Sequence, residues 1–244
     1  MISKQKNDYK PAQGIGRLFS VLLAFAAMLV PSMAFASGGE NVHLEFAPSD
    51  MYFLYASLLF GIIAVAAGFY YRAKVTAVDP GDEKMQEVRK AIRDGALAYL
   101  QTQGKTIAIF ILLLGAGLYA LYAPKYEPMV ALALVVCFVL GVAASYIAGY
   151  VGMDMAVKAN MRTAASALTS YKKATEVAFH AGAVAGLLTV GMGLLGATLI
   201  FIASPQNAMK LLVGFGFGGS LAALFMRVGG GIYTKAADVG ADLV

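Results

Sequence analysis

Four ionisable residues near the end of the chain have types and spacing that could do chemistry: Arg227, Lys235, Asp238 and Asp242. Together with Gly231 they recur at intervals of three or four residues, so in a helix all five share one face. Two carboxylates four residues apart repel each other when both are ionised. Mg²⁺, which prefers hard oxygen ligands, would relieve that repulsion. Lys235, a compact positive charge, would then bind an anion beside the metal.

The same charges could simply mark a helix that leaves the membrane, because charged side chains at helix ends usually reach water. Arg227 argues against this interpretation. At about 1.5 Å per residue it lies roughly 22 Å along the helix axis from Asp242, so the two cannot share one thin interface. A cation at one depth and a metal-binding end at another are more typical of a pump than of an anchor.

The composition of the chain defines the elements that must position these residues. Of the 244 residues 59% are hydrophobic, 14% are charged and 27 are glycines, and the mean hydropathy is +0.71. These values indicate a membrane protein with several spans and exclude a soluble domain. The net charge of +5 is no sign of nucleic-acid binding, because the basic residues lie in short stretches between apolar runs. Cys137, the one cysteine, lies in an apolar run and is predicted to be a core residue.

The apolar runs predict an all-α, polytopic bundle of transmembrane helices with five spans: 51–71, 105–122, 129–153, 174–203, and a fifth from about 208 to the end. The stretch PGDEK should start a helix that leads through the amphipathic segment 87–101 into the second span. The third helix should continue beyond its span into the polar segment 154–173. Two turns, YAPKYEP at 122–128 and SPQN at 204–207, separate the later spans.

Residues 1–36 have the pattern of a signal peptide. A basic start precedes the apolar run 18–30, and Ala34-Phe35-Ala36 forms a cleavage site before Ser37. The alternative is an extra helix that is not cleaved. The membrane domain then comprises residues 37–244.

The basic residues between spans predict the orientation. They are concentrated after the first and third spans, whereas the connections after the second and fourth hold only Lys125 and Lys210. By the positive-inside rule the two basic connections are cytoplasmic. The mature amino terminus is then outside, and the charged end of the fifth span faces the cytoplasm.

Three other features have simpler explanations. The glycines of the fifth span, at 214–219 and 229–231, suit close helix packing rather than a phosphate-binding loop. His180 is predicted to be a polar residue near a helix start and not a ligand. Asp154, Lys158 and Arg162 recur every four residues and are predicted to form a solvated helix face.

Four stretches carry a resemblance to a known family. GGGIYTKAADVGADLV at 229–244 resembles the signature of the membrane-bound, ion-pumping pyrophosphatases, and GFGFGGSLAALFMR at 214–227 resembles the part of the helix before it. GYVGMDMAVKANMRTA at 149–164 and FHAGAVAGLL at 179–188 are similar to further parts of the family. The resemblance runs from about residue 51 to the last residue.

The resemblance implies pyrophosphate hydrolysis coupled to pumping of H⁺ or Na⁺. It implies a homodimer with sixteen helices per subunit in the cell (inner) membrane. Mg²⁺ would be required, and K⁺ is a second candidate ion. Lys235 matches the family's substrate-binding lysine, Asp238 an aspartate at the magnesium-pyrophosphate site, and Asp242 an aspartate near the attacking water. By their chemistry, Asp238 and Asp242 both suit metal binding or the positioning of water. Arg227 matches an arginine of the ion-coupling region.

In this family the motif continues beyond the residue that matches Val244, with G-K-x-E and many more helices. We therefore expect the chain to be the N-terminal part of a longer protein and to be inactive alone. The choice between H⁺ and Na⁺ depends on residues beyond this chain. The alternative is a small, glycine-rich membrane protein without enzyme activity, such as a channel subunit or assembly factor. The gene sequence after Val244 distinguishes the two.

Overall fold

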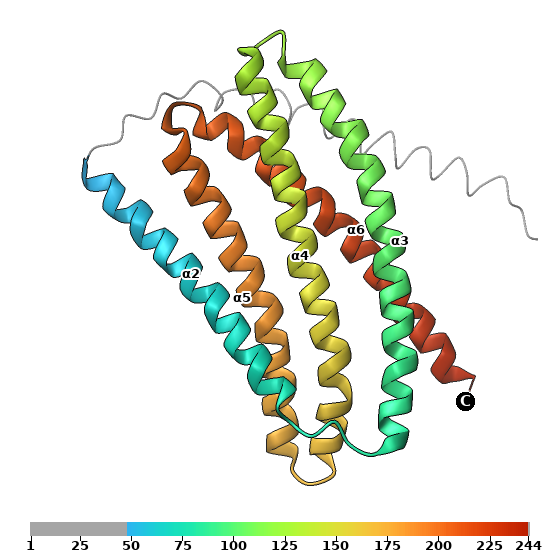
Figure 1. The fold of residues 1–244 in the computed structure, drawn as a ribbon. Helices are drawn as coiled ribbons and strands as arrows, with labels where there is room; N and C mark the ends of the chain where they lie inside the picture. The colour runs from blue at the N-terminus through green and yellow to red at the C-terminus, as the bar shows by residue number, and fades with distance from the viewer. Residues whose placement is uncertain (1–47, 244) are drawn as a thin grey trace, which may run out of the picture. The chain divides into compact units, whose positions relative to one another are not determined.

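A computed structural model describes residues 48–243 of the chain, and the predicted signal peptide lies outside this range. The described residues form five long α-helices and one short 3-10 helix, without a strand, which confirms the all-α prediction. The elements are α2 (Pro48–Thr76), α3 (Glu83–Tyr122), α4 (Pro128–Ala167), α5 (Tyr171–Ala203), η2 (Pro205–Asn207) and α6 (Ala208–Asp242) (Figure 1).

Each of the five long helices is long and apolar enough to cross a membrane, and each contains one predicted span. Since a bilayer offers no hydrogen-bond partner to the backbone, apolar runs of this length fold as helices. α3 and α4 each contain 40 residues. Their length of about 60 Å is twice the hydrocarbon thickness of about 30 Å, so their polar halves extend beyond it. The protein is a multi-pass membrane protein.

Local chemistry sets the start of α3, which is predicted at PGDEK, and the start of α4, whose first residue is predicted to end the preceding turn. Asp82 caps α3, because its carboxylate accepts a hydrogen bond from the backbone N–H of Met85 at 2.8 Å. Gly81, just before it, has φ of +89°, a conformation that glycine adopts without strain. Pro128 is the first residue of α4, where its missing N–H costs no helical bond.

The predicted continuation of α4 through residue 173 is wrong in its last six residues. α4 does extend into the polar segment, but it ends at Ala167 and α5 begins at Tyr171. Ser170 caps α5 by accepting from the N–H of Lys173, and the hydroxyl of Thr169 donates to the carbonyl of Ser166. These side-chain hydrogen bonds to the backbone compete with a continuous helix and produce the turn.

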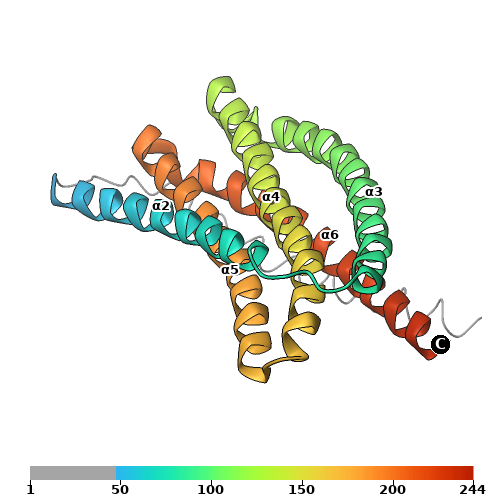
Figure 2. The same ribbon diagram turned by 60° about the horizontal axis from the view of Figure 1, so that its bottom comes forward.

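α4 is the central helix of the described bundle. It packs against α3, α5 and α6, while α2 packs mainly against α5. Figure 1 and Figure 2 show α6 crossing obliquely behind α4. α4 contributes to all three buried apolar clusters, and Cys137 lies in one of them, as predicted.

Glycines allow the close crossing of α4 and α6. A Cβ atom on Gly218 would collide with the carbonyl of Phe138, one on Gly214 with that of Leu134, and one on Gly141 with that of Phe215. The backbones therefore approach within a distance that only glycine permits. The packing prediction is confirmed for Gly214 and Gly218.

The basic connections between helices lie at one end of the bundle. Lys74 at the end of α2 forms an ion pair of 3.2 Å with Glu176 at the start of α5. Tyr233 near the end of α6 donates to the carbonyl of Ile92 near the start of α3. The connections after the first and third spans thus lie at the same end as the charged part of α6, and the orientation relative to the cytoplasm stays a prediction.

Candidate functional site on helix α6

The charged face predicted for the fifth span exists on one unbroken helix. α6 runs from Ala208 to Asp242, and the five residues of this face are all exposed: Arg227, Gly231, Lys235, Asp238 and Asp242. The buried residues of α6 are Ala208, Leu211, Gly214, Gly218, Ala222 and Gly229. At 3.6 residues per turn the two sets lie on roughly opposite sides of the helix. The charged face is therefore turned away from the packing contacts of α6.

Lys235 and Asp238 form an ion pair, with 3.1 Å between Nζ and Oδ2. Their side chains are 82% and 64% exposed, so water screens the pair and it contributes little to stability. Either group can exchange its partner for a ligand at little cost. The cation next to Asp238 in this structure is thus Lys235 itself.

The donor set fits Mg²⁺ in a shared site. Within residues 48–243 no three His, Cys, Asp or Glu side chains come together to hold a metal. Asp238 and Asp242 offer two exposed carboxylates one helical turn apart. Mg²⁺ usually keeps several waters and binds through one or two carboxylates together with substrate phosphates. The two aspartates suit that mode.

Arg227 lies at the other end of the charged face. It is exposed, and it forms no ion pair with any residue in the described range 48–243. A guanidinium at membrane depth without a carboxylate is costly.

The prediction of a solvated face at Asp154, Lys158 and Arg162 is wrong. Arg162 is only 8% exposed and donates to three carbonyl oxygens: from Nε to Val78 at 3.0 Å, from Nη1 to Lys158 at 2.8 Å and from Nη2 to Thr76 at 3.2 Å. Thr76 is the last residue of α2 and Val78 lies just after it, so their carbonyls have no donor within that helix, and the N–H groups of a guanidinium can satisfy them.

The carboxylate of Asp154 is shared between two helices. It accepts from Lys158 at 2.7 Å and from Arg72 of α2 at 3.3 Å. Together with Arg162 it joins the end of α2 to α4. The four-residue spacing is visible in the sequence, but no local pattern indicates that the end of α2 packs against this face.

His180 lies in the contact between two helices. It lies in the first third of α5, stacks on Tyr71 with 4.8 Å between the ring centroids, and has Nδ1 4.0 Å from the carboxylate of Glu176. Its surroundings are those of a packed interface between α2 and α5.

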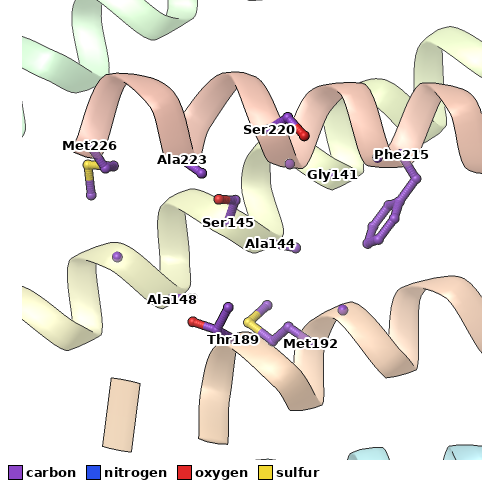
Figure 3. Close-up of a pocket in the computed structure, with 14 residues that line it drawn as sticks. Gly141, Ala144, Ser145, Ala148, Thr189, Met192, Phe215, Ser220, Ala223 and Met226 are labelled. Atoms are coloured by element: carbon purple, nitrogen blue, oxygen red, sulfur yellow. The ribbon is translucent and has the colours of Figure 1, made fainter. Parts of the chain in front are cut away.

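A concavity of about 520 Å³ lies where α4, α5 and α6 meet (Figure 3). Its polar groups are the hydroxyls of Ser145, Thr189 and Ser220, and glycines, alanines, Phe215 and two methionines make up the rest. No ionisable side chain lines it. A concavity without a charge cannot neutralise a polyvalent anion, so the charged face of α6 is the better candidate for chemistry on an anion.

Comparisons with known proteins show which family this chain resembles. The sequence profile of the family described as inorganic H⁺ pyrophosphatase matches residues 62–244. A K(+)-insensitive pyrophosphate-energized proton pump of Chloroflexus aurantiacus is 47% identical over 206 residues, which cover 78% of this chain and 27% of the relative. Proton pump 2 of Moorella thermoacetica, with the same description, is 47% identical over 189 residues, covering 75% and 27%.

A third relative is named as a pump for a different ion. A protein of Clostridium tetani, named as a candidate K(+)-stimulated pyrophosphate-energized sodium pump, is 43% identical over 192 residues, which cover 79% of this chain and 27% of the relative. This chain thus spans about a quarter of the length of the relatives it matches. The profile match covers most of the chain and includes every residue of the charged face. The chain belongs to the inorganic H⁺ pyrophosphatase family.

Proposed function

We propose that the protein containing this chain hydrolyses pyrophosphate and uses the released energy to move H⁺ across a membrane. The charged face of α6 would supply part of the catalytic site and part of the ion path. The observation that carries the proposal is the arrangement on this helix. Lys235, Asp238 and Asp242 lie at its polar end, Arg227 lies deeper on the same face, and the packing contacts lie on the opposite side.

Each residue at the polar end has a stated role in this proposal. Lys235 binds a phosphate oxygen of pyrophosphate, which replaces Asp238 as its partner. Asp238 and Asp242 are the ligands for Mg²⁺, which would neutralise phosphate charge as it does in other phosphoryl transfers. Asp242 also orients the attacking water by accepting one of its hydrogen bonds.

Arg227 belongs to the ion path rather than to the pyrophosphate site. Eight residues separate it from Lys235, which is about 12 Å along the axis of a straight helix. A guanidinium at that depth needs a carboxylate, and the described helices supply none. Its partner would come from helices of the full protein beyond this chain, and the pairing would change as the ion passes.

The relatives favour H⁺ as the transported ion and activity without K⁺. The Chloroflexus and Moorella proteins are named as K(+)-insensitive proton pumps, whereas the Clostridium protein carries the name of a sodium pump. The full protein is proposed to lie in the cell inner membrane as a homodimer, with the polar end of α6 in the cytoplasm, where pyrophosphate is available.

Membrane vesicles that contain the full-length protein test the proposal. Phosphate release from magnesium pyrophosphate measures hydrolysis, and quenching of a pH-sensitive dye measures acidification of the vesicle interior. We expect both signals without added Na⁺ or K⁺, and we expect a protonophore to abolish only the second. Hydrolysis that depends on Na⁺ would overturn the choice of ion. Absence of hydrolysis in well-folded protein would overturn the function itself.

A further inference from the structure

The charged half of α6 has few packing contacts of its own. Its last buried residue is Gly229, and every residue from 231 to 242 is exposed except Tyr233. A helix end without burial tends to fray and to move. Catalytic groups must nevertheless be held close to one geometry, because displacements of about 1 Å are enough to reduce turnover strongly. Another contact should therefore hold this segment.

Two tyrosine hydroxyls connect this half of α6 to α3. Tyr233 on α6 donates to the carbonyl of Ile92 at 3.0 Å, and Tyr99 on α3 donates to the carbonyl of Met226 at 3.4 Å. The two rings lie side by side, with centroids 6.1 Å apart. The bonds run in opposite directions between the helices, so together they restrain both the rotation and the axial position of α6 against α3.

Glycines provide the space for this contact. A Cβ atom on Gly229 would collide with the ring of Tyr99, and one on Gly95 would just touch Tyr233 at 3.8 Å. Gly230, the next residue, has nothing within 4 Å of the same position. The first glycine of the GGG run therefore has a definite steric role.

The contact lies close to the functional residues in sequence and in space. Tyr99 binds the carbonyl of Met226, the residue before Arg227, and Tyr233 is two residues before Lys235. We propose that Tyr99 and Tyr233 are positioning residues, which hold the charged face of α6 at the depth and rotation that pyrophosphate hydrolysis and ion coupling require. This inference rests on the proposed function of α6. It assigns roles to two residues of which neither touches substrate.

Tyrosine-to-phenylalanine variants of the full-length protein test the inference, because phenylalanine keeps the ring and removes only the hydroxyl. Tyr146→Phe is the matched control. Its hydroxyl also donates to a backbone carbonyl of α3, that of Leu100 at 3.0 Å, but it comes from α4, so this hydrogen bond joins α3 to α4 and not to α6. The first measurement is hydrogen–deuterium exchange of the peptides that cover residues 230–242, which needs no activity.

We expect Tyr233→Phe to speed amide exchange in residues 230–242 about two- to tenfold, the range that follows from one hydrogen bond. Tyr99→Phe should speed exchange less than Tyr233→Phe does, because the hydrogen bond of Tyr99 is longer. Gly229→Ala, which displaces the Tyr99 ring, should speed exchange as Tyr99→Phe does, whereas Gly230→Ala should not. Tyr146→Phe should leave this segment unchanged. Equal exchange in all variants, or the same change in Tyr146→Phe, would overturn the inference.

Kinetics then separate positioning from general stability. Tyr233→Phe, beside Lys235, should raise KM for magnesium pyrophosphate about two- to tenfold. Tyr99→Phe, beside Arg227, should lower the number of ions moved per pyrophosphate and leave KM unchanged. Wild-type kinetics in both variants would contradict a positioning role even if exchange changed. If the wild-type protein shows no hydrolysis, the proposed function fails, and the exchange experiment still decides whether the tyrosines hold α6.

Discussion

Nζ of Lys235 lies 3.1 Å from Oδ2 of Asp238, one helical turn further along α6. Both side chains are exposed, and the pair is an intrahelical one of the kind that adds only about 0.2–0.5 kcal/mol to stability. The ion pair therefore matters more for ligand binding than for the stability of the fold. A lysine and an aspartate that hold each other loosely leave an anion site and a cation site when they separate. Magnesium pyrophosphate carries both partners needed to replace this contact.

Substitution of Asp242 by asparagine should abolish hydrolysis in the full-length protein. Asn keeps the shape and one acceptor oxygen but loses the charge that holds a metal or orients water. We expect kcat to fall about a hundredfold or more, with KM changed less, as for a contact made mainly in the transition state. Phosphate release from purified protein is the measurement.

Glu127→Gln is the control for this substitution. Glu127 is an exposed carboxylate before α4, and it forms no side-chain cap. Its variant should hydrolyse pyrophosphate at the wild-type rate. Normal turnover in Asp242→Asn would remove Asp242 from the catalytic site.

Arg227→Lys should separate transport from hydrolysis. Lysine keeps the charge but lacks the planar fork with which arginine binds a carboxylate in two places. Ion transport in vesicles should fall several-fold more than hydrolysis in detergent, because Arg227 lies about 12 Å from Lys235 along the helix. A strictly proportional loss of both activities would instead assign Arg227 to the catalytic site or to the fold.

The orientation can be tested by labelling single cysteines in a Cys137→Ala background. A cysteine that replaces Lys84 or Lys172 should react with an impermeant maleimide only from the cytoplasmic side. One that replaces Lys125 should react only from outside, because the positive-inside rule places the two sets of connections on opposite sides. The reverse pattern would put the polar end of α6 outside and contradict the cytoplasmic catalytic site.

Gly218→Ala should destabilise the bundle by about 1–3 kcal/mol, the usual cost of forcing extra atoms into a packed interface. The added methyl group would meet the carbonyl of Phe138, which the backbone of α4 holds in place. Gly216→Ala is the matched control, because nothing lies within 4 Å of its Cβ position. It should be neutral or more stable by up to about 1 kcal/mol, since alanine favours the helix. Denaturant unfolding in micelles gives both values, and equal effects would refute the close crossing.

The local chemistry of the sequence determines the elements of this protein. Five apolar runs predict five helices because a bilayer leaves the backbone no other partner. Asp82 and Pro128 mark helix starts through properties of single side chains. The shared face of Arg227, Lys235, Asp238 and Asp242 follows from the period of the helix alone, and the structure confirms it on one unbroken α6.

Tertiary structure alone decided which side of each helix meets a neighbour. Gly216 and Gly218 are the same residue type in the same run, yet only Gly218 faces the backbone of α4. Arg162 is spaced like a residue of a solvated face and is nevertheless buried, because Thr76 at the end of α2 and Val78 just after it supply carbonyls that accept from its guanidinium. The hydroxyl of Tyr233 donates to the carbonyl of Ile92, which lies 141 residues earlier in the chain. Periodicity indicates which residues share a face, but the partner of that face depends on contacts between segments far apart in the chain, and no local pattern contains them.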